Sequence, residues 1–209
     1  MGEHVILLHG IWMRGFSLAA LRLRLDKAGF IAHAFEYASV AQGPGPSVAR
    51  LLQRIRDLGA DCVHLVGHSL GGLIALQAAR QGGLPPGKVV CLGSPLRGSA
   101  AARGLSRFPG GAVVLGRSGE ILREGLDDWQ DARPVGVIAG RLPYGLGAIV
   151  GALGDDHDGT VGVDETRLPG IADHCVVPAT HTGLLFSTEA AERTVAFLRE
   201  GRFTPAPAG

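Results

Sequence analysis

The sequence predicts an α/β fold: a minimal, mostly parallel sheet of about six strands with helices on both faces. Short β-branched, apolar runs alternate with stretches of helical periodicity, a pattern typical of a parallel sheet covered on both sides. The chain of 209 residues is long enough for one domain with a sizeable core. Its composition, 46% hydrophobic and 19% charged with a mean hydropathy of +0.22, is that of a globular protein.

The strands and helices are expected in a regular order. The predicted strands span residues 4–8, 31–35, 62–66, 88–92, 135–139 and 174–177. Three stripes of apolar residues at helical spacing predict helices, namely Leu18, Leu21 and Leu25; Val48, Leu51, Leu52, Ile55 and Leu58; and Ala191, Val195 and Leu198. Ser17 and Ser47 are placed to cap the first two of these helices.

The charge and cysteine content of the chain indicate which classes of partner and which compartment to expect. With 20 Lys and Arg against 19 Asp and Glu, scattered along the chain, the sequence indicates no nucleic acid partner. No apolar run approaches the ~20 residues of a membrane helix, so we expect no stable membrane insertion. Cys62, Cys91 and Cys175 lie in or beside apolar runs as inert thiols, which favours a reducing, cytoplasmic location. A secreted location would require a leader that has been removed. The composition does not indicate an oligomeric state.

The pentapeptide 67–71, Gly-His-Ser-Leu-Gly, connects the third strand to an alanine-rich helical run. A serine hydroxyl is a weak nucleophile, and a sharp strand-to-helix turn exposes it to a substrate and a general base. Glycines two residues either side of Ser69 leave room for the strand and the helix to cross closely. The pattern therefore predicts a nucleophile elbow centred on Ser69, with the amide of Leu70 directed at a developing oxyanion.

Two other loops at the carboxyl edge of the sheet supply partners for Ser69. The His-Gly turn after the first strand can offer the amide of Ile11 as a second oxyanion donor, although an ordinary glycine turn has the same pattern. Of the eight histidines, His181 follows the last strand and precedes a glycine, and we assign it as the general base.

The loop 154–161 supplies the acid that would orient His181. Asp158 is favoured because it precedes a glycine and a β-branched pair, with Asp156 and Asp164 as alternatives. The same loop has a rival interpretation as a calcium loop, with carboxylates at Asp156, Asp158 and Glu165. Its first ligand position is Gly154 and no helix is expected before it, so we predict no metal site.

Together these motifs resemble the small lipases and esterases of the α/β-hydrolase superfamily, especially the compact bacterial triacylglycerol lipases. The resemblance covers most of the chain, from His4 to the last helix. It implies the α/β-hydrolase fold, a triad in the chain order Ser69, Asp158, His181, and oxyanion donors at Ile11 and Leu70. Loop 93–99 is similar to a Gly-Thr-Pro-His-x-Gly-Ser loop of lipase-like proteins, with leucine in place of the histidine. Two leading strands of the larger members are not found here.

We expect one domain over residues 1–209, with a flexible tail at 203–209. The glycine-rich segment 99–131 is longer than a single crossover requires, and longer than in the smallest lipases. It is either a small cap over the active site that shapes the substrate pocket, or an elaborated crossover of two short helices. Bulky apolar residues on carboxyl-edge loops are the candidate substrate-binding residues: Trp12, Met13, Phe16, Leu96, Tyr144, Leu146 and Leu184.

The sequence therefore predicts a serine hydrolase that cleaves carboxylic esters through an acyl-enzyme intermediate. The expected substrate is a small-molecule or lipid ester, and the chemistry needs no metal or organic cofactor. An acyltransferase or a thioesterase would use the same triad. A catalytically silent binding module would keep only the fold.

Overall fold

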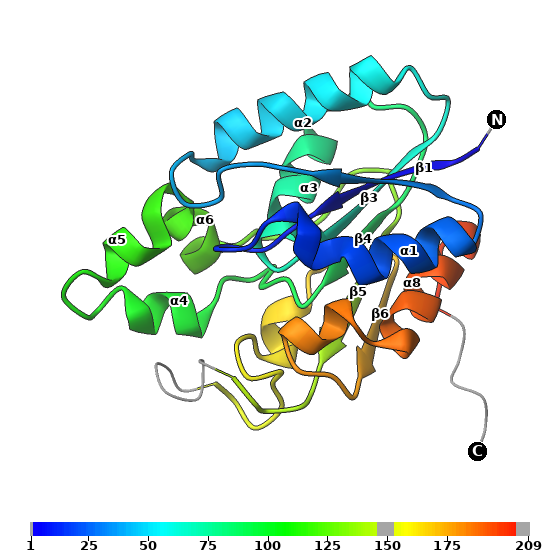
Figure 1. The fold of residues 1–209 in the computed structure, drawn as a ribbon. Helices are drawn as coiled ribbons and strands as arrows, with labels where there is room; N and C mark the ends of the chain where they lie inside the picture. Colours follow the sequence, from blue (N-terminus) through cyan, green and yellow to red (C-terminus); the bar gives the residue numbers. More distant parts are fainter. Residues whose placement is uncertain (1, 146–152, 204–209) are drawn as a thin grey trace.

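The computed structural model describes residues 2–145 and 153–203 (Figure 1). It contains a six-stranded, wholly parallel sheet in the order β2-β1-β3-β4-β5-β6. The strands are β1 (His4–Leu8), β2 (Ile31–Phe35), β3 (Val63–His68), β4 (Val89–Leu92), β5 (Val135–Gly140) and β6 (Asp173–Val177). The predicted sheet is confirmed, with strand ends that differ from the prediction by up to two residues.

The register brings the carboxyl ends of the strands to one edge. Leu8 pairs with Gly67, and Leu92 pairs with both His68 and Ile138. Because parallel strands end side by side, the loops that follow them gather at this edge. The turns after β1, β3, β4, β5 and β6 are therefore neighbours although they lie far apart in sequence.

Helices cover both faces of the sheet (Figure 1). The longer ones are α1 (Ala19–Lys27), α2 (Pro44–Leu58), α3 (Leu70–Arg80) and α8 (Thr188–Glu200). Shorter ones are α4 (Ala100–Leu105), α5 (Gly111–Leu115), α6 (Gly119–Glu124), η1 (Gly15–Leu18), η2 (Gly116–Ser118), η3 (Val163–Thr166) and η4 (Thr182–Leu185). Helices α4 to α6 extend beyond the end of β1 at one side of the molecule (Figure 1).

Two hydrophobic cores lie on opposite faces of the sheet. Alternate residues of β1 divide between them: Ile6 and Leu8 pack with α2 and α3, whereas Val5 and Leu7 pack with α1 and α8. Because both faces are buried, a central strand is apolar at nearly every position. This explains why the strands were readable as continuous apolar runs.

Both predicted helix caps are wrong. Ser17 lies inside η1 and donates its hydroxyl to the carbonyl of Arg14, while α1 starts two residues later without a side-chain cap. Helix α2 starts at Pro44, so Ser47 lies within its first turn and bonds back to the carbonyl of Gly43. Proline fits the first turn of a helix because its missing N–H has no partner there, and this moves the start ahead of the serine.

The chain's end and its cysteines differ in part from expectation. Phe203, assigned to the tail, is buried against Phe197, and its amide donates to Asp173; residues 204–209 of that tail lie outside the described residues. The three cysteines are free, but only Cys91 is fully buried.

Among the described residues, no helix combines the length and apolar character needed to cross a membrane.

Candidate active site

Ser69 lies at the tight turn between β3 and α3. Its φ of 54° and ψ of −121° are unusual for a residue with a side chain, and among the described non-glycine residues only Trp12 also has a positive φ. The amide of Ser69 donates to the carbonyl of Leu92 at 2.8 Å, which ties the turn to β4. A strained backbone of this kind, fixed by its surroundings, is typical of a strand-to-helix nucleophile elbow.

Glycine is required on both sides of this turn. A β-carbon on Gly67 would lie 2.3 Å from the amide nitrogen of Gly72, and one on Gly71 would lie 2.4 Å from the carbonyl oxygen of Leu8. Real β-carbons do not approach backbone atoms so closely. The close crossing expected from the sequence is therefore present, and it brings the start of α3 against the end of β1.

Asp158 and His181 form a hydrogen-bonded pair beside the elbow. His181 Nδ1–H donates to Asp158 Oδ2 at 2.7 Å, and the His181 amide donates to the Asp158 carbonyl at 2.8 Å. The second carboxylate oxygen accepts from the amides of Thr160 and Val161 at 2.9 and 2.8 Å. These contacts hold a buried carboxylate in one orientation and leave Nε2 of His181 as the unprotonated nitrogen.

The alternative acids do not reach this histidine. Asp156 pairs with Arg141 at 2.8 Å, and Asp164 is fully exposed beside Arg167. Gly93, in the loop after β4, has a φ of 53°, which favours glycine, and a β-carbon there would lie 2.8 Å from Leu184 Cδ1 and 3.1 Å from Asp158 Oδ2.

His68, the residue before Ser69, contacts the loop that carries His181. Its Nε2–H donates to the carbonyl of His181 at 3.0 Å, and the two rings lie 4.7 Å apart. Complete burial lowers the pKa of His68 to about 3, so this ring is neutral. The sequence offers no signal for this contact.

No hydrogen bond joins Ser69 Oγ to His181 among the residues that the structure describes. The contact of His68 with His181 nevertheless brings the elbow and the base loop together, since His68 is adjacent to Ser69 in the chain. Catalytic hydrogen bonds are often long without a substrate and shorten in the substrate complex.

The amides of Ile11 and Leu70 are available as donors. Neither donates to an acceptor within the described parts of the chain. The turn that carries Ile11 is held by His9, whose Nδ1–H donates to the carbonyl of Gly10 at 2.9 Å, and by Tyr37, whose hydroxyl donates to the carbonyl of His9 at 2.6 Å. The His9 and Tyr37 rings stack at 4.4 Å, and burial lowers the pKa of His9.

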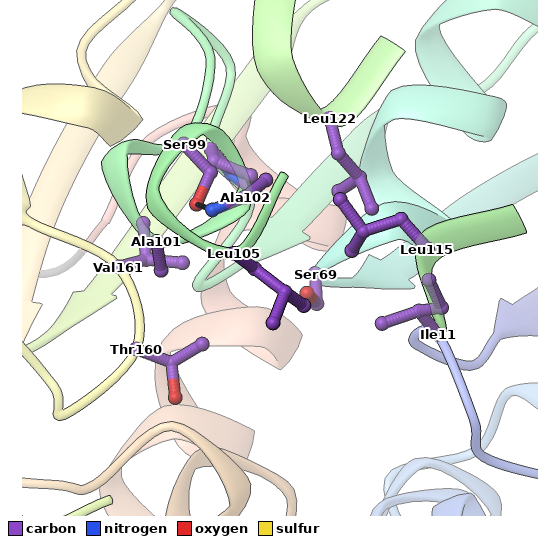
Figure 2. A pocket seen from close by; sticks show the side chains of 11 residues that line it. Ile11, Ser69, Ser99, Ala101, Ala102, Leu105, Leu115, Leu122, Thr160 and Val161 are labelled. Atoms are coloured by element: carbon purple, nitrogen blue, oxygen red, sulfur yellow. Dashed lines mark hydrogen bonds between the residues drawn. The ribbon is translucent and has the colours of Figure 1, made fainter. Parts of the chain in front are cut away.

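A cavity of about 90 Å³ opens beside Ser69 (Figure 2). Its walls are almost wholly apolar, and the Ser99 hydroxyl accepts a hydrogen bond from the amide of Ala102. The lining residues are Ile11, Ser69, Pro95, Ser99, Ala101, Ala102, Leu105, Leu115, Leu122, Thr160 and Val161. About half of them belong to the segment 99–131, and Figure 2 shows Leu105, Leu115 and Ile11 around Ser69.

Of the predicted substrate-binding residues that the structure describes, none lines this cavity. Leu96 and Leu184 are fully buried in the two cores, while Phe16 and Tyr144 point largely into solvent. Trp12 and Met13 border a neighbouring hollow, and Leu146 lies outside the described residues. The apolar character of these residues was visible in the sequence, but the direction of their side chains depends on loop geometry.

The carboxylates of the rival calcium loop have protein partners. Asp158 binds His181 and two amides, Asp156 binds Arg141, and Glu165 accepts from the amides of Gly162 and Ala100. These contacts account for the acidic residues without calcium.

A second cluster, Glu3, Cys62 and His64, has ligand atoms within 4.8 Å of one another. The amide of Lys88 donates to His64 Nδ1 at 3.0 Å, so the ring proton is on Nε2, the atom that faces Cys62 and Glu3. A protonated nitrogen cannot ligate a metal ion, and this tautomer therefore argues against a metal site.

A parallel sheet with an elbow serine and an Asp–His pair at its carboxyl edge is the arrangement of an α/β hydrolase. The family model described as the alpha/beta hydrolase family matches residues 5–202. The chain belongs to this family, as its motifs predicted. Among proteins of curated function, none matches the sequence.

Several solved structures share the fold. The mature lipase BlEst2 from Bacillus licheniformis has a TM-score of 0.75 at 18% identity, covering 94% of this chain and 90% of that one. The lin2722 product from Listeria innocua has a TM-score of 0.65 at 19% identity, covering 96% of this chain and 95% of that one. RedJ, a thioesterase from the prodiginine pathway of Streptomyces coelicolor, has a TM-score of 0.58 at 14% identity, covering 93% of this chain and 84% of that one. The chain spans 52% of the longer propeptide form of BlEst2.

Proposed function

We propose that this protein is a serine hydrolase that cleaves carboxylic esters, with Ser69 as nucleophile, His181 as general base and Asp158 as the orienting acid. The observation that carries the proposal is the 2.7 Å bond from His181 Nδ1–H to Asp158, formed beside an elbow serine. This bond fixes the tautomer in which Nε2 can accept the proton of the Ser69 hydroxyl.

The reaction proceeds in two halves. Ser69 Oγ attacks the ester carbonyl while its proton passes to Nε2 of His181, and the amides of Ile11 and Leu70 hold the oxyanion. The C–O bond to the alcohol then breaks as His181 returns the proton to the leaving oxygen, which leaves an acyl-enzyme. Water repeats the sequence and releases the acid. This route uses the chain's own groups and requires no metal or organic cofactor.

The cavity favours a compact apolar group on one side of the scissile ester. Its volume of about 90 Å³ is well below the 300–1,000 Å³ of pockets for drug-sized ligands, and its walls offer little hydrogen bonding. The contribution of Leu105, Leu115 and Leu122 to these walls supports the interpretation of residues 99–131 as a cap. We therefore expect short-chain esters to react faster than long-chain esters.

Labelling with a fluorophosphonate tests the nucleophile. The wild type should be labelled, and Ser69→Ala should not be, with a loss of kcat on the order of 10⁴ to 10⁶. His181→Ala should react equally poorly, whereas His33→Ala on the edge strand β2 should keep wild-type activity. Wild-type labelling that survives in Ser69→Ala would exclude the proposed nucleophile.

A substrate panel separates the related activities. Rates on p-nitrophenyl esters of increasing chain length, compared with matched thioesters, distinguish an esterase from a thioesterase, the activity for which RedJ is named. Leu115→Ala shortens a side chain in the cavity wall and leaves room for a longer acyl chain. Each further methylene of the substrate that is buried there stabilises the bound ester by about 0.8 kcal/mol. The preferred acyl chain should therefore lengthen by two or more carbons.

A further inference from the structure

Trp12 connects the turn after β1 to the segment 99–131 through its side chain. The indole Nε1–H donates to the carbonyl of Val114 in α5 at 2.9 Å, across 102 positions of sequence. The side chain is 54% exposed, so core packing does not fix it. The bond to Val114 is therefore the main polar contact that orients this ring.

The backbone of Trp12 is held in an unfavourable region. Its φ of 60° lies in the left-handed region, which bulky residues rarely adopt. The turn is closed by a bond from the Met13 amide to the Gly10 carbonyl at 3.3 Å, a long one. A conformation of this kind persists only where its surroundings hold it, and the contact with Val114 is one such constraint.

The same two segments also meet inside the cavity. Ile11 and Leu115, the neighbours of Trp12 and Val114 in sequence, both line it (Figure 2). The turn 9–13 and α5 are therefore joined by the indole bond and border the same cavity. A shift of α5 would reach the peptide group that follows Ile11 through the bond between Trp12 and Val114.

We propose that Trp12 is a positioning residue that couples the placement of α5 to the direction of the Ile11 amide. This inference rests on the proposed function, in which that amide stabilises the oxyanion. The indole bond holds Trp12 in its left-handed conformation, and this conformation sets the direction of the turn. Loss of the bond releases the turn, and the Ile11 amide is then less well aligned with the developing charge.

Loss of this bond should leave α5 attached. The Ser118 hydroxyl donates to the carbonyl of Ser39 at 2.6 Å, and the Arg117 amide donates to the carbonyl of Val40 at 3.1 Å. These contacts hold η2, which directly follows α5, to the loop after β2. The effect of removing the indole donor should therefore be confined to the turn 9–13.

Trp12→Phe is the test, because it keeps an aromatic ring but removes the N–H donor. We expect the rate constant for fluorophosphonate labelling and kcat to fall about tenfold, with KM within about twofold. This loss is smaller than the 10²–10³-fold fall in kcat that follows complete removal of an oxyanion donor. Phe108→Leu is the matched control, since Phe108 is an exposed aromatic between α4 and α5 that does not line the cavity, and it should behave as wild type.

Hydrogen exchange supplies a readout that does not depend on activity. Peptides covering 9–13 should exchange faster in Trp12→Phe, while peptides of α3 and β4 and the melting temperature stay unchanged. Wild-type labelling kinetics, or unchanged exchange in the turn, would overturn the proposal. Slow labelling with faster exchange throughout the chain would also overturn it, as a general loss of structure. A wild type that resists labelling would instead contradict the proposed function.

Discussion

At the scale of single residues, the orientation of one imidazole decides whether the proposed chemistry works. Asp158 uses one oxygen for His181 and the other for the amides of Thr160 and Val161. The carboxylate therefore cannot rotate without giving up backbone contacts. The ring it holds presents Nε2 as an acceptor, which is the state that a general base requires.

Asp158→Asn should abolish most activity while preserving the fold. The amide oxygen can still accept from the two backbone amides, but the NH₂ group would face Nδ1 of His181. The ring proton would then move to Nε2, and the base would become a donor. By analogy with such a change in serine proteases, kcat should fall about 10⁴-fold; steady-state kinetics and thermal unfolding measure the two effects.

Asp156→Asn is the control for this change. Asp156 forms an ion pair with Arg141 at the surface, and ion pairs exposed to solvent contribute little to stability. Its activity should stay within about twofold of wild type. Equal losses in the two variants would contradict the assignment of Asp158.

The residue scale also separates what the sequence could predict from what it could not. The place of Ser69, Asp158 and His181 at one edge of the sheet was predictable because each lies in a loop that follows a strand, and parallel strands bring such loops together; their catalytic roles stay a prediction. Leu96 and Leu184 follow strands too, yet both turn into the cores. Position along the chain gives the loop, whereas the direction of a side chain depends on the backbone angles of that loop.

At the scale of elements, the crossing of β1, β3 and α3 determines where the elbow lies. The amide end of α3 can approach β1 only because residue 71 has no side chain. This proximity brings the amide of Leu70 to the same region as that of Ile11. The glycines of the elbow are thus structural requirements for the proposed oxyanion site as well as for packing.

Gly71→Ala should destabilise the protein strongly. The added β-carbon would lie 2.4 Å from the carbonyl oxygen of Leu8 and 2.8 Å from that of His9, and backbone atoms cannot rotate aside. We expect a loss of about 3 kcal/mol in the free energy of unfolding, at the upper end for overpacking. Urea unfolding monitored by circular dichroism measures it.

Gly45→Ala in α2 is the matched control. A β-carbon there meets nothing within 4 Å, and alanine favours helix more than glycine does. This variant should be as stable as wild type or slightly more stable. A Gly71→Ala variant with wild-type stability would contradict the close crossing.

The elements themselves were predictable to different degrees. The strands were readable because burial on both faces makes them continuously apolar, and α2 because its apolar stripe repeats over several turns. Helices α4, α5 and α6 are five or six residues long. Helices so short depend on tertiary contacts, such as the Ser118 bond to Ser39, which the sequence does not reveal.

At the scale of the whole molecule, three histidines are built into the fold in neutral form. Burial lowers the pKa of His68 to about 3 and those of His64 and His174 to about 4. His64 accepts from the Lys88 amide, a contact that only the neutral ring can make. His68 donates to the His181 carbonyl and His174 donates to the Thr166 hydroxyl, and for these two rings burial is the cause of the neutral state. They lie on β3 and β6, so protonation would affect the sheet itself.

Stability should fall as the pH is lowered from about 6.5 to 4. An exposed histidine in the unfolded chain has a pKa near 6.5, so the unfolded state binds more protons than the folded state across this window. The free energy of unfolding then decreases with decreasing pH, by about 1–2 kcal/mol at pH 5 for His64 and for His68. Urea unfolding at pH 7.5 and pH 5.0 measures the difference.

His64→Gln isolates one of these contributions. The glutamine oxygen can accept from the Lys88 amide as His64 Nδ1 does, but it has no proton to gain in this range. The variant should therefore lose less stability than wild type between pH 7.5 and 5.0, because one fewer proton is taken up on unfolding. An identical pH dependence in the two proteins would show that His64 is not held neutral, and an unchanged wild-type stability at pH 5.0 would contradict the buried neutral state for all three rings.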